Sequence, residues 1–128
     1  MKFLGIDYGK RKVGLALSDG VIAEPFRVIR YKKEGELVKR IEEVLNTEKV
    51  EFIVVGVSEG KMAEETKNFV RLLKETVRTP IIFQDESLST YTAKELALKA
   101  NIKRRKRQKM EDAYSAAIIL QNYLDNLS

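Results

Sequence analysis

The sequence of 128 residues contains neither cysteine nor histidine. Without these residues the chain cannot form disulfides, thiolate nucleophiles, iron–sulfur clusters or Cys/His zinc sites. A Ser-His-Asp triad, a Cys-His pair and an imidazole general base are excluded for the same reason. Any catalytic chemistry must therefore use carboxylates, lysine, arginine, tyrosine, hydroxyl groups or a metal ion held by oxygen ligands.

Long apolar runs are also missing, because no segment approaches 18 consecutive apolar residues. The first residues contain no apolar run typical of a signal peptide. We therefore expect no membrane association and a cytoplasmic location, in agreement with the absence of cysteine. The length and the 44% of hydrophobic residues predict a single globular domain over residues 1–128.

The formal net charge of +5 is concentrated in one short segment, residues 103–109. Without the six basic side chains of this segment, the remaining chain carries a formal charge of −1. Such a patch either lies in a solvated loop or contacts a polyanion, and the concentration of charge favours nucleic acid. The expected contacts are to the phosphate backbone rather than to bases. The predicted binding residues are Arg11, Lys12, Lys103, Arg104, Arg105, Lys106, Arg107 and Lys109.

The spacing of apolar residues predicts the element order β-β-β-α-β-α-β-α-α. Strands are expected at 2–8, 12–18, within 21–31, at 52–57 and at 80–84, and helices at 34–47, 62–78, 92–100 and 110–127. Three antiparallel strands followed by parallel βα units indicate an α/β fold with a mixed sheet flanked by helices. Ligands of such sheets gather at the carboxyl ends of strands.

Acidic residues occur at three places in this pattern where an apolar or neutral residue is more usual. Asp7 ends the first strand, on the face that also carries Phe3 and Gly5. Asp85 and Glu86 directly follow the strand at 80–84. Asp112 heads the apolar stripe of the last helix, which consists of Ala116, Ile119, Leu120 and Tyr123.

Each of these acids has an ordinary explanation, as a turn residue, a solvated loop residue or a complement to the helix dipole. Together, they are expected to meet at one edge of the sheet, where mutual repulsion raises at least one carboxyl pKa. Mg²⁺ and Mn²⁺ prefer such oxygen ligands and relieve the repulsion. Two such ions can activate water and stabilise a leaving oxygen in phosphodiester hydrolysis.

Three segments resemble the signatures of the YqgF (RuvX) family. They are GIDYGKRKVGLALSD at 5–19, DESLST at 85–90 and EDAYSAAIILQ at 111–121. The resemblance implies an RNase H-like fold related to the resolvase RuvC, and a nuclease that matures the 5′ end of pre-16S rRNA in ribosome precursors. It also implies that Asp7, Glu86 and Asp112 are the catalytic acids and hold Mg²⁺ or Mn²⁺, as two ions.

The sequence departs from the family pattern at several positions. The segment after the strand at 52–57 lacks the usual proline and contains Glu59, whose role is open, as is that of Asp85. Lys10 replaces a common threonine, and Ser87 replaces a common arginine that could contact phosphate. None of these departures affects the three acids.

Four interpretations stay open at this point. The first is an RNA-processing nuclease, and the second is a Holliday junction resolvase acting on branched DNA, which a stable dimer would favour. The third is a phosphotransferase of the actin–sugar-kinase type, which usually requires a second lobe. The fourth is a non-catalytic RNA-binding module.

Overall fold

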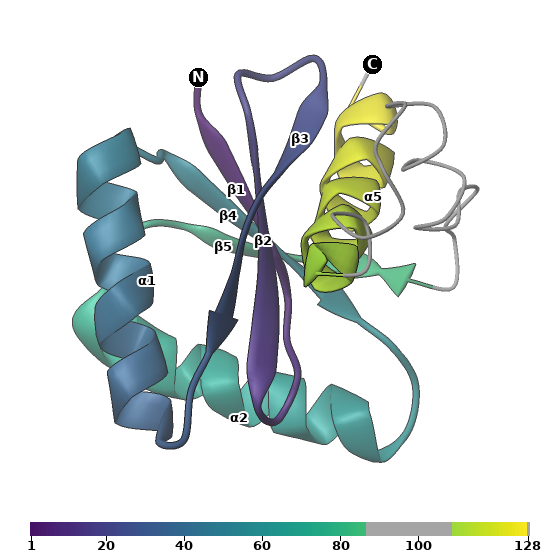
Figure 1. Cartoon of the computed structure of the whole chain (residues 1–128). Coiled ribbons are helices and arrows are strands. Elements are labelled where there is room, and N and C mark those ends of the chain that lie inside the picture. The colour runs from purple at the N-terminus through teal and green to yellow at the C-terminus, as the bar shows by residue number, and fades with distance from the viewer. Residues whose placement is uncertain (87–108, 128) are drawn as a thin grey trace.

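The computed structural model describes residues 1–86 and 109–127 (Figure 1). The predicted helix at 92–100, Ser87 and the basic residues Lys103, Arg104, Arg105, Lys106 and Arg107 lie outside the described residues. The elements are β1 (Phe3–Asp7), β2 (Lys12–Ser18), β3 (Ala23–Arg30), α1 (Glu34–Glu48), β4 (Phe52–Val57), α2 (Lys61–Thr76), β5 (Ile81–Asp85) and α5 (Glu111–Asp125). Each of them was predicted from the sequence to within a few residues.

The five strands form one mixed sheet in the order β3-β2-β1-β4-β5. β1 pairs with β2, and β2 with β3, in antiparallel fashion, whereas β1–β4 and β4–β5 are parallel. The predicted mixed α/β sheet is therefore confirmed. One difference concerns Asp85, which is the last residue of β5 and pairs with Val57, so that Glu86 is the first residue beyond the strand.

Helices cover both faces of the sheet (Figure 1). On one face, α1 and α2 enclose the larger core, to which Leu4 and Ile6 of β1 and the following residue Tyr8 contribute. On the other face, α5 packs against Phe3 and Ala16 through a smaller core rich in alanine. The alternation of side chains along β1 thus places Asp7 on the α5 face. Within residues 1–86 and 109–127, no helix combines the length and the apolar character needed to cross a membrane.

Candidate active site

Asp7 lies at the end of β1, partly buried between the sheet and α5. Its backbone is paired with Gly14 of β2. Burial and, to a smaller extent, the nearby charges of Glu86 and Asp112 together raise the pKa of the Asp7 carboxyl from 3.8 to about 7. The three acids that the sequence analysis singled out therefore influence one another in the folded chain.

Glu86 reaches back from the end of β5 toward Asp7, and the two carboxyl groups are hydrogen-bonded. Burial and the charge of Asp85 raise the pKa of Glu86, whereas the hydrogen bond to Asp7 lowers it. The same hydrogen bond raises the pKa of Asp7. Two carboxyl groups can share a hydrogen bond only if one of them is protonated, and the raised pKa of Asp7 favours a proton on this pair.

The Glu86 side chain lies directly over a glycine of β4. A Cβ atom on Gly56 would come within 2.6 Å of Glu86 Oε1 and within 2.4 Å of Ile119 Cδ1 on α5. Both distances are far below van der Waals contact, so any larger residue would displace the carboxylate or the helix. Gly56 follows Val55, which pairs with Ile6 of β1, so Glu86 is held next to the end of β1.

Asp112 enters the site from the first turn of α5, which touches the sheet at a second glycine. A Cβ atom on Gly14 would stand only 1.8 Å from the Asp112 carbonyl oxygen. Because Gly14 is the backbone partner of Asp7, this contact brings Asp112 to the strand position beside Asp7. Sequence analysis missed both Gly14 and Gly56, although glycine within a strand often marks a close approach of another segment.

The Asp112 carboxylate is paired with the ammonium group of Lys12. Lys12 Nζ lies 3.1 Å from Asp112 Oδ2, and the side chains are 50% and 29% exposed, respectively. Sequence analysis assigned Lys12 to nucleic-acid binding and did not foresee this acidic partner. In the described part of the chain, no group of three acidic side chains is arranged so that it could hold a metal ion as it stands.

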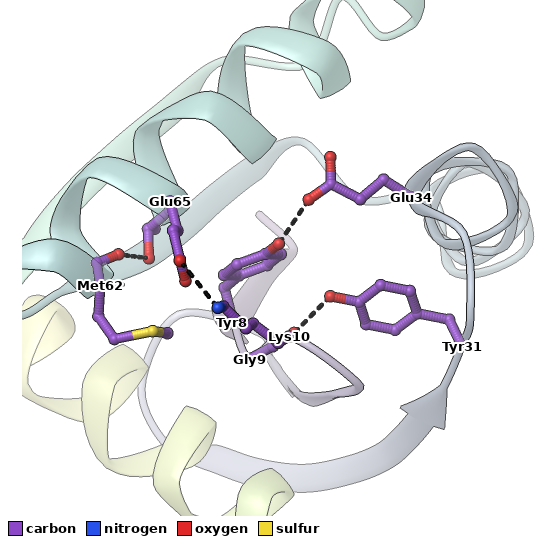
Figure 2. Close-up of polar contacts among 8 residues, drawn as sticks. Tyr8, Gly9, Lys10, Tyr31, Glu34, Met62 and Glu65 are labelled. Carbon is purple, nitrogen blue, oxygen red and sulfur yellow. Dashed lines mark hydrogen bonds and ion pairs between the residues drawn. The ribbon is translucent and has the colours of Figure 1, made fainter.

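The turn between β1 and β2, which follows Asp7, is anchored on the opposite face of the sheet (Figure 2). The Tyr8 hydroxyl donates to Glu34 Oε1 over 2.6 Å, and its ring stacks on Phe69 with centroids 4.6 Å apart. The Tyr31 hydroxyl donates to the Gly9 carbonyl oxygen. Burial, followed by the hydrogen bond to Glu34, raises the pKa of Tyr8, so the hydroxyl stays protonated and keeps donating. These contacts fix the backbone on the carboxyl side of Asp7.

Besides Lys12, two of the predicted nucleic-acid-binding residues lie among the described residues. Arg11 lies exposed in the turn between β1 and β2, four residues beyond Asp7. Lys109 is exposed three residues before Asp112, next to the start of α5. Both residues are close to an acid in the sequence, and their contacts with nucleic acid stay a prediction.

Comparison with known proteins places the chain in a family. The family model described as "RuvX: Holliday junction resolvase" matches residues 1–126. The chain belongs to the RuvX family. The resemblance seen in the three sequence signatures is therefore confirmed.

The relatives of this RuvX family member share its length. A protein of Clostridium acetobutylicum named "Putative pre-16S rRNA nuclease" is 36% identical over 135 residues, covering 99% of this chain and 100% of the relative. A protein of the same name from Caldanaerobacter subterraneus is 38% identical over 135 residues, covering 98% and 97%.

The fold of this RuvX family member is that of RuvC. The structure of Thermus thermophilus RuvC in complex with a Holliday junction substrate superposes with a TM-score of 0.69. The two chains are 18% identical over 98% of this chain and 96% of RuvC. The expected RNase H-like fold is thereby confirmed.

Proposed function

We propose that this chain is a metal-dependent nuclease that hydrolyses phosphodiester bonds of RNA and processes the 5′ end of pre-16S rRNA. The observation that carries the proposal is the convergence of three acids from different elements. Asp7 ends β1, Glu86 directly follows β5, and Asp112 lies in the first turn of α5. Burial, followed by the charges of Glu86 and Asp112, raises the pKa of Asp7 to about 7. A cluster of carboxylates with such a shift is typical of a functional site.

The residues fit a divalent cation held by oxygen. Asp7 and Glu86 already share one proton, and a cation that takes its place relieves both the burial of charge and the repulsion. Asp7, Glu86 and, after rotation of its side chain, Asp112 would hold Mg²⁺ or Mn²⁺, and the three acids offer ligands for two ions. When bound, the ions supply activation of water and stabilisation of the leaving oxygen.

The chain itself positions the substrate and the acids. Gly14 and Gly56 allow α5 and Glu86 to approach Asp7 closely. The exposed basic residues Arg11 and Lys109, which are four residues after Asp7 and three residues before Asp112, are suited to bind substrate phosphates. The rest of the basic segment adds charge for the same purpose. Binding through the backbone gives affinity without base specificity, so the site of cleavage depends on the shape of the RNA or on the ribosome precursor that presents it.

RNA is favoured as the substrate by the names of the curated relatives, which match this chain over its whole length. We also propose that the single domain of residues 1–128 acts in the cytoplasm, where ribosome precursors mature. A second candidate function is the resolution of branched DNA. It is favoured by the description of the family and by the likeness in fold to RuvC.

The experiment that tests the proposal is a cleavage assay with end-labelled substrates. Single-stranded RNA carrying the 5′ leader of pre-16S rRNA, duplex RNA and a four-way DNA junction are incubated with Mg²⁺, with Mn²⁺ and with chelator. The wild type is compared with Asp7→Asn and with Asp19→Asn. Asp19 is a matched control because its side chain is 92% exposed at the other end of the sheet.

We expect metal-dependent cleavage of the leader RNA by the wild type and by Asp19→Asn, and none by Asp7→Asn. Cleavage of the junction alone would replace the RNA substrate with branched DNA. Binding of RNA without cleavage under any metal would refute the nuclease and favour a binding module.

A further inference from the structure

Lys12 is the one residue of the candidate site whose observed contact differs from its expected role. It is the first residue of β2 and lies on the same face as Gly14, two residues further on, where α5 begins. Its ammonium group is paired with Asp112 at 3.1 Å. The other lysine of this turn for which an ion pair is observed, Lys10, turns the opposite way and pairs with Glu65 of α2 at 3.2 Å (Figure 2).

Among the three acids, Asp112 already faces a positive charge, the ammonium group of Lys12. A divalent cation that uses all three carboxylates must therefore displace Lys12. Ion pairs between partly exposed side chains are weak and easily exchanged. The Lys12 side chain is 50% exposed, so its flexible stem can leave Asp112 without disturbing the core.

We propose that Lys12 is an exchangeable counter-ion of the site, which holds Asp112 before metal binds and contacts a substrate phosphate afterwards. The inference rests on the proposed nuclease function and adds the order in which Lys12 changes its partner. Before metal binds, Lys12 offsets the charge of Asp112. Once the cation has taken Asp112, the released ammonium is a free positive charge beside the acids, and phosphate is its natural new partner.

This role predicts two effects of opposite sign for a single substitution. Lys12→Met keeps the length of the side chain and removes the charge. Divalent cations then bind without displacing a lysine and without a positive neighbour, so their affinity rises roughly three- to tenfold. Cleavage at saturating metal falls roughly ten- to a hundredfold, because a charged contact to the phosphate is lost. Lys12→Arg restores most of the cleavage.

The test measures Mn²⁺ binding by electron paramagnetic resonance and cleavage of the leader RNA, both with the full chain. The variants are Lys12→Met, Lys12→Arg, Asp7→Asn to identify the site, and Lys10→Met as the matched control. Lys10→Met removes the same charge two residues away, where its partner Glu65 lies on the far face of the sheet. We expect its metal affinity and cleavage rate to stay within about twofold of the wild type.

The outcomes separate the inference from the function on which it rests. Tighter Mn²⁺ binding with slower cleavage in Lys12→Met alone supports the exchange. Slower cleavage with unchanged or weaker Mn²⁺ binding overturns it, because Lys12 then contacts phosphate without competing for Asp112. Unchanged cleavage in Lys12→Met overturns it as well. If the wild type binds no Mn²⁺ at the Asp7 site or cleaves no nucleic acid, the proposed function itself fails and the inference fails with it.

Discussion

Replacement of Asp7 by asparagine is expected to stabilise the metal-free protein at alkaline pH. Burial is the largest cause of the raised pKa of Asp7, which lies at about 7 in the folded chain and at 3.8 as its ordinary value. Between these two pH values, the folded chain keeps a proton that the unfolded chain has lost. The free energy of unfolding therefore falls as pH rises, by at most about 1.4 kcal/mol per pH unit.

The size of the effect follows from the two pKa values. Well below pH 3.8, the carboxyl is neutral in both states and imposes no penalty, and the penalty is complete once pH is well above the folded pKa. Between pH 5 and pH 8, the wild type should lose about 2–3 kcal/mol on this account. Asparagine has nearly the same shape and no charge, so Asp7→Asn removes this loss while keeping a polar partner for Glu86.

The assay is urea unfolding in the presence of chelator at pH 5, 6, 7 and 8. The difference in unfolding free energy between Asp7→Asn and the wild type should grow by about 2–3 kcal/mol over this range. Asp19→Asn, whose side chain is 92% exposed at the other end of the sheet, is the matched control. Saturating Mg²⁺ should abolish the slope of the wild type, because the cation replaces the shared proton. A difference between Asp7→Asn and wild type that is constant with pH, or that shrinks toward pH 8, would refute the reasoning.

Three further predictions concern the surroundings of the acids. Gly14→Ala forces a Cβ to 1.8 Å from the Asp112 carbonyl oxygen and should lower the unfolding free energy by roughly 3 kcal/mol. Gly35→Ala is the control, because Gly35 lies in α1 and its new Cβ would have no atom within 4 Å. This substitution should be neutral or stabilising by up to about 1 kcal/mol. If Gly14→Ala and Gly35→Ala changed the unfolding free energy equally in urea, the close approach at Gly14 would be contradicted. Tyr8→Phe removes the donation to Glu34 and should lower the unfolding free energy by roughly 1–3 kcal/mol, and an unchanged urea midpoint would show that the hydrogen bond contributes nothing. Replacing lysines and arginines of segment 103–109 by glutamine should weaken the salt dependence of duplex RNA binding. The slope of log binding constant against log salt concentration, measured by fluorescence anisotropy, should fall in magnitude by about 0.9 per lost phosphate contact. An unaltered slope would show that the segment does not contact the RNA.

The elements of the fold were predictable because their patterns are local. Phe52–Val57 is an uninterrupted apolar run and is a buried parallel strand, and the spacing of Leu37, Val38 and Ile41 marks the inner face of α1. Strand alternation also placed Asp7 on the face opposite to Leu4 and Ile6. Each of these inferences needs only neighbouring residues and a fixed period.

The contacts of the site were less predictable because they join residues far apart in the chain. Nothing in the sequence shows that Lys12 reaches Asp112, which is 100 positions later, because a lysine in a turn is equally compatible with solvent or phosphate. The hydrogen bond between Asp7 and Glu86 depends on the register of three strands and on the loop after β5. The candidate acids could be singled out from their unusual positions, with Glu86 preferred over Asp85 only through the family resemblance, whereas their partners could be identified only from the folded chain.

The position of Asp112 is a consequence of how α5 packs. The face of α5 that meets the sheet contains Ala113, Ala116 and Ala117, all fully buried. Opposite the start of α5, the sheet also has a small residue, Gly14. Small residues on both sides let the helix backbone come within contact of the strand backbone, and this closeness brings a short aspartate side chain to the end of β1. A larger core on this face would bury more apolar surface, but it would lift Asp112 away from Asp7. The small alanine-rich core on this face therefore contributes less packing energy than a larger core would, but it allows Asp112 to lie close to Asp7.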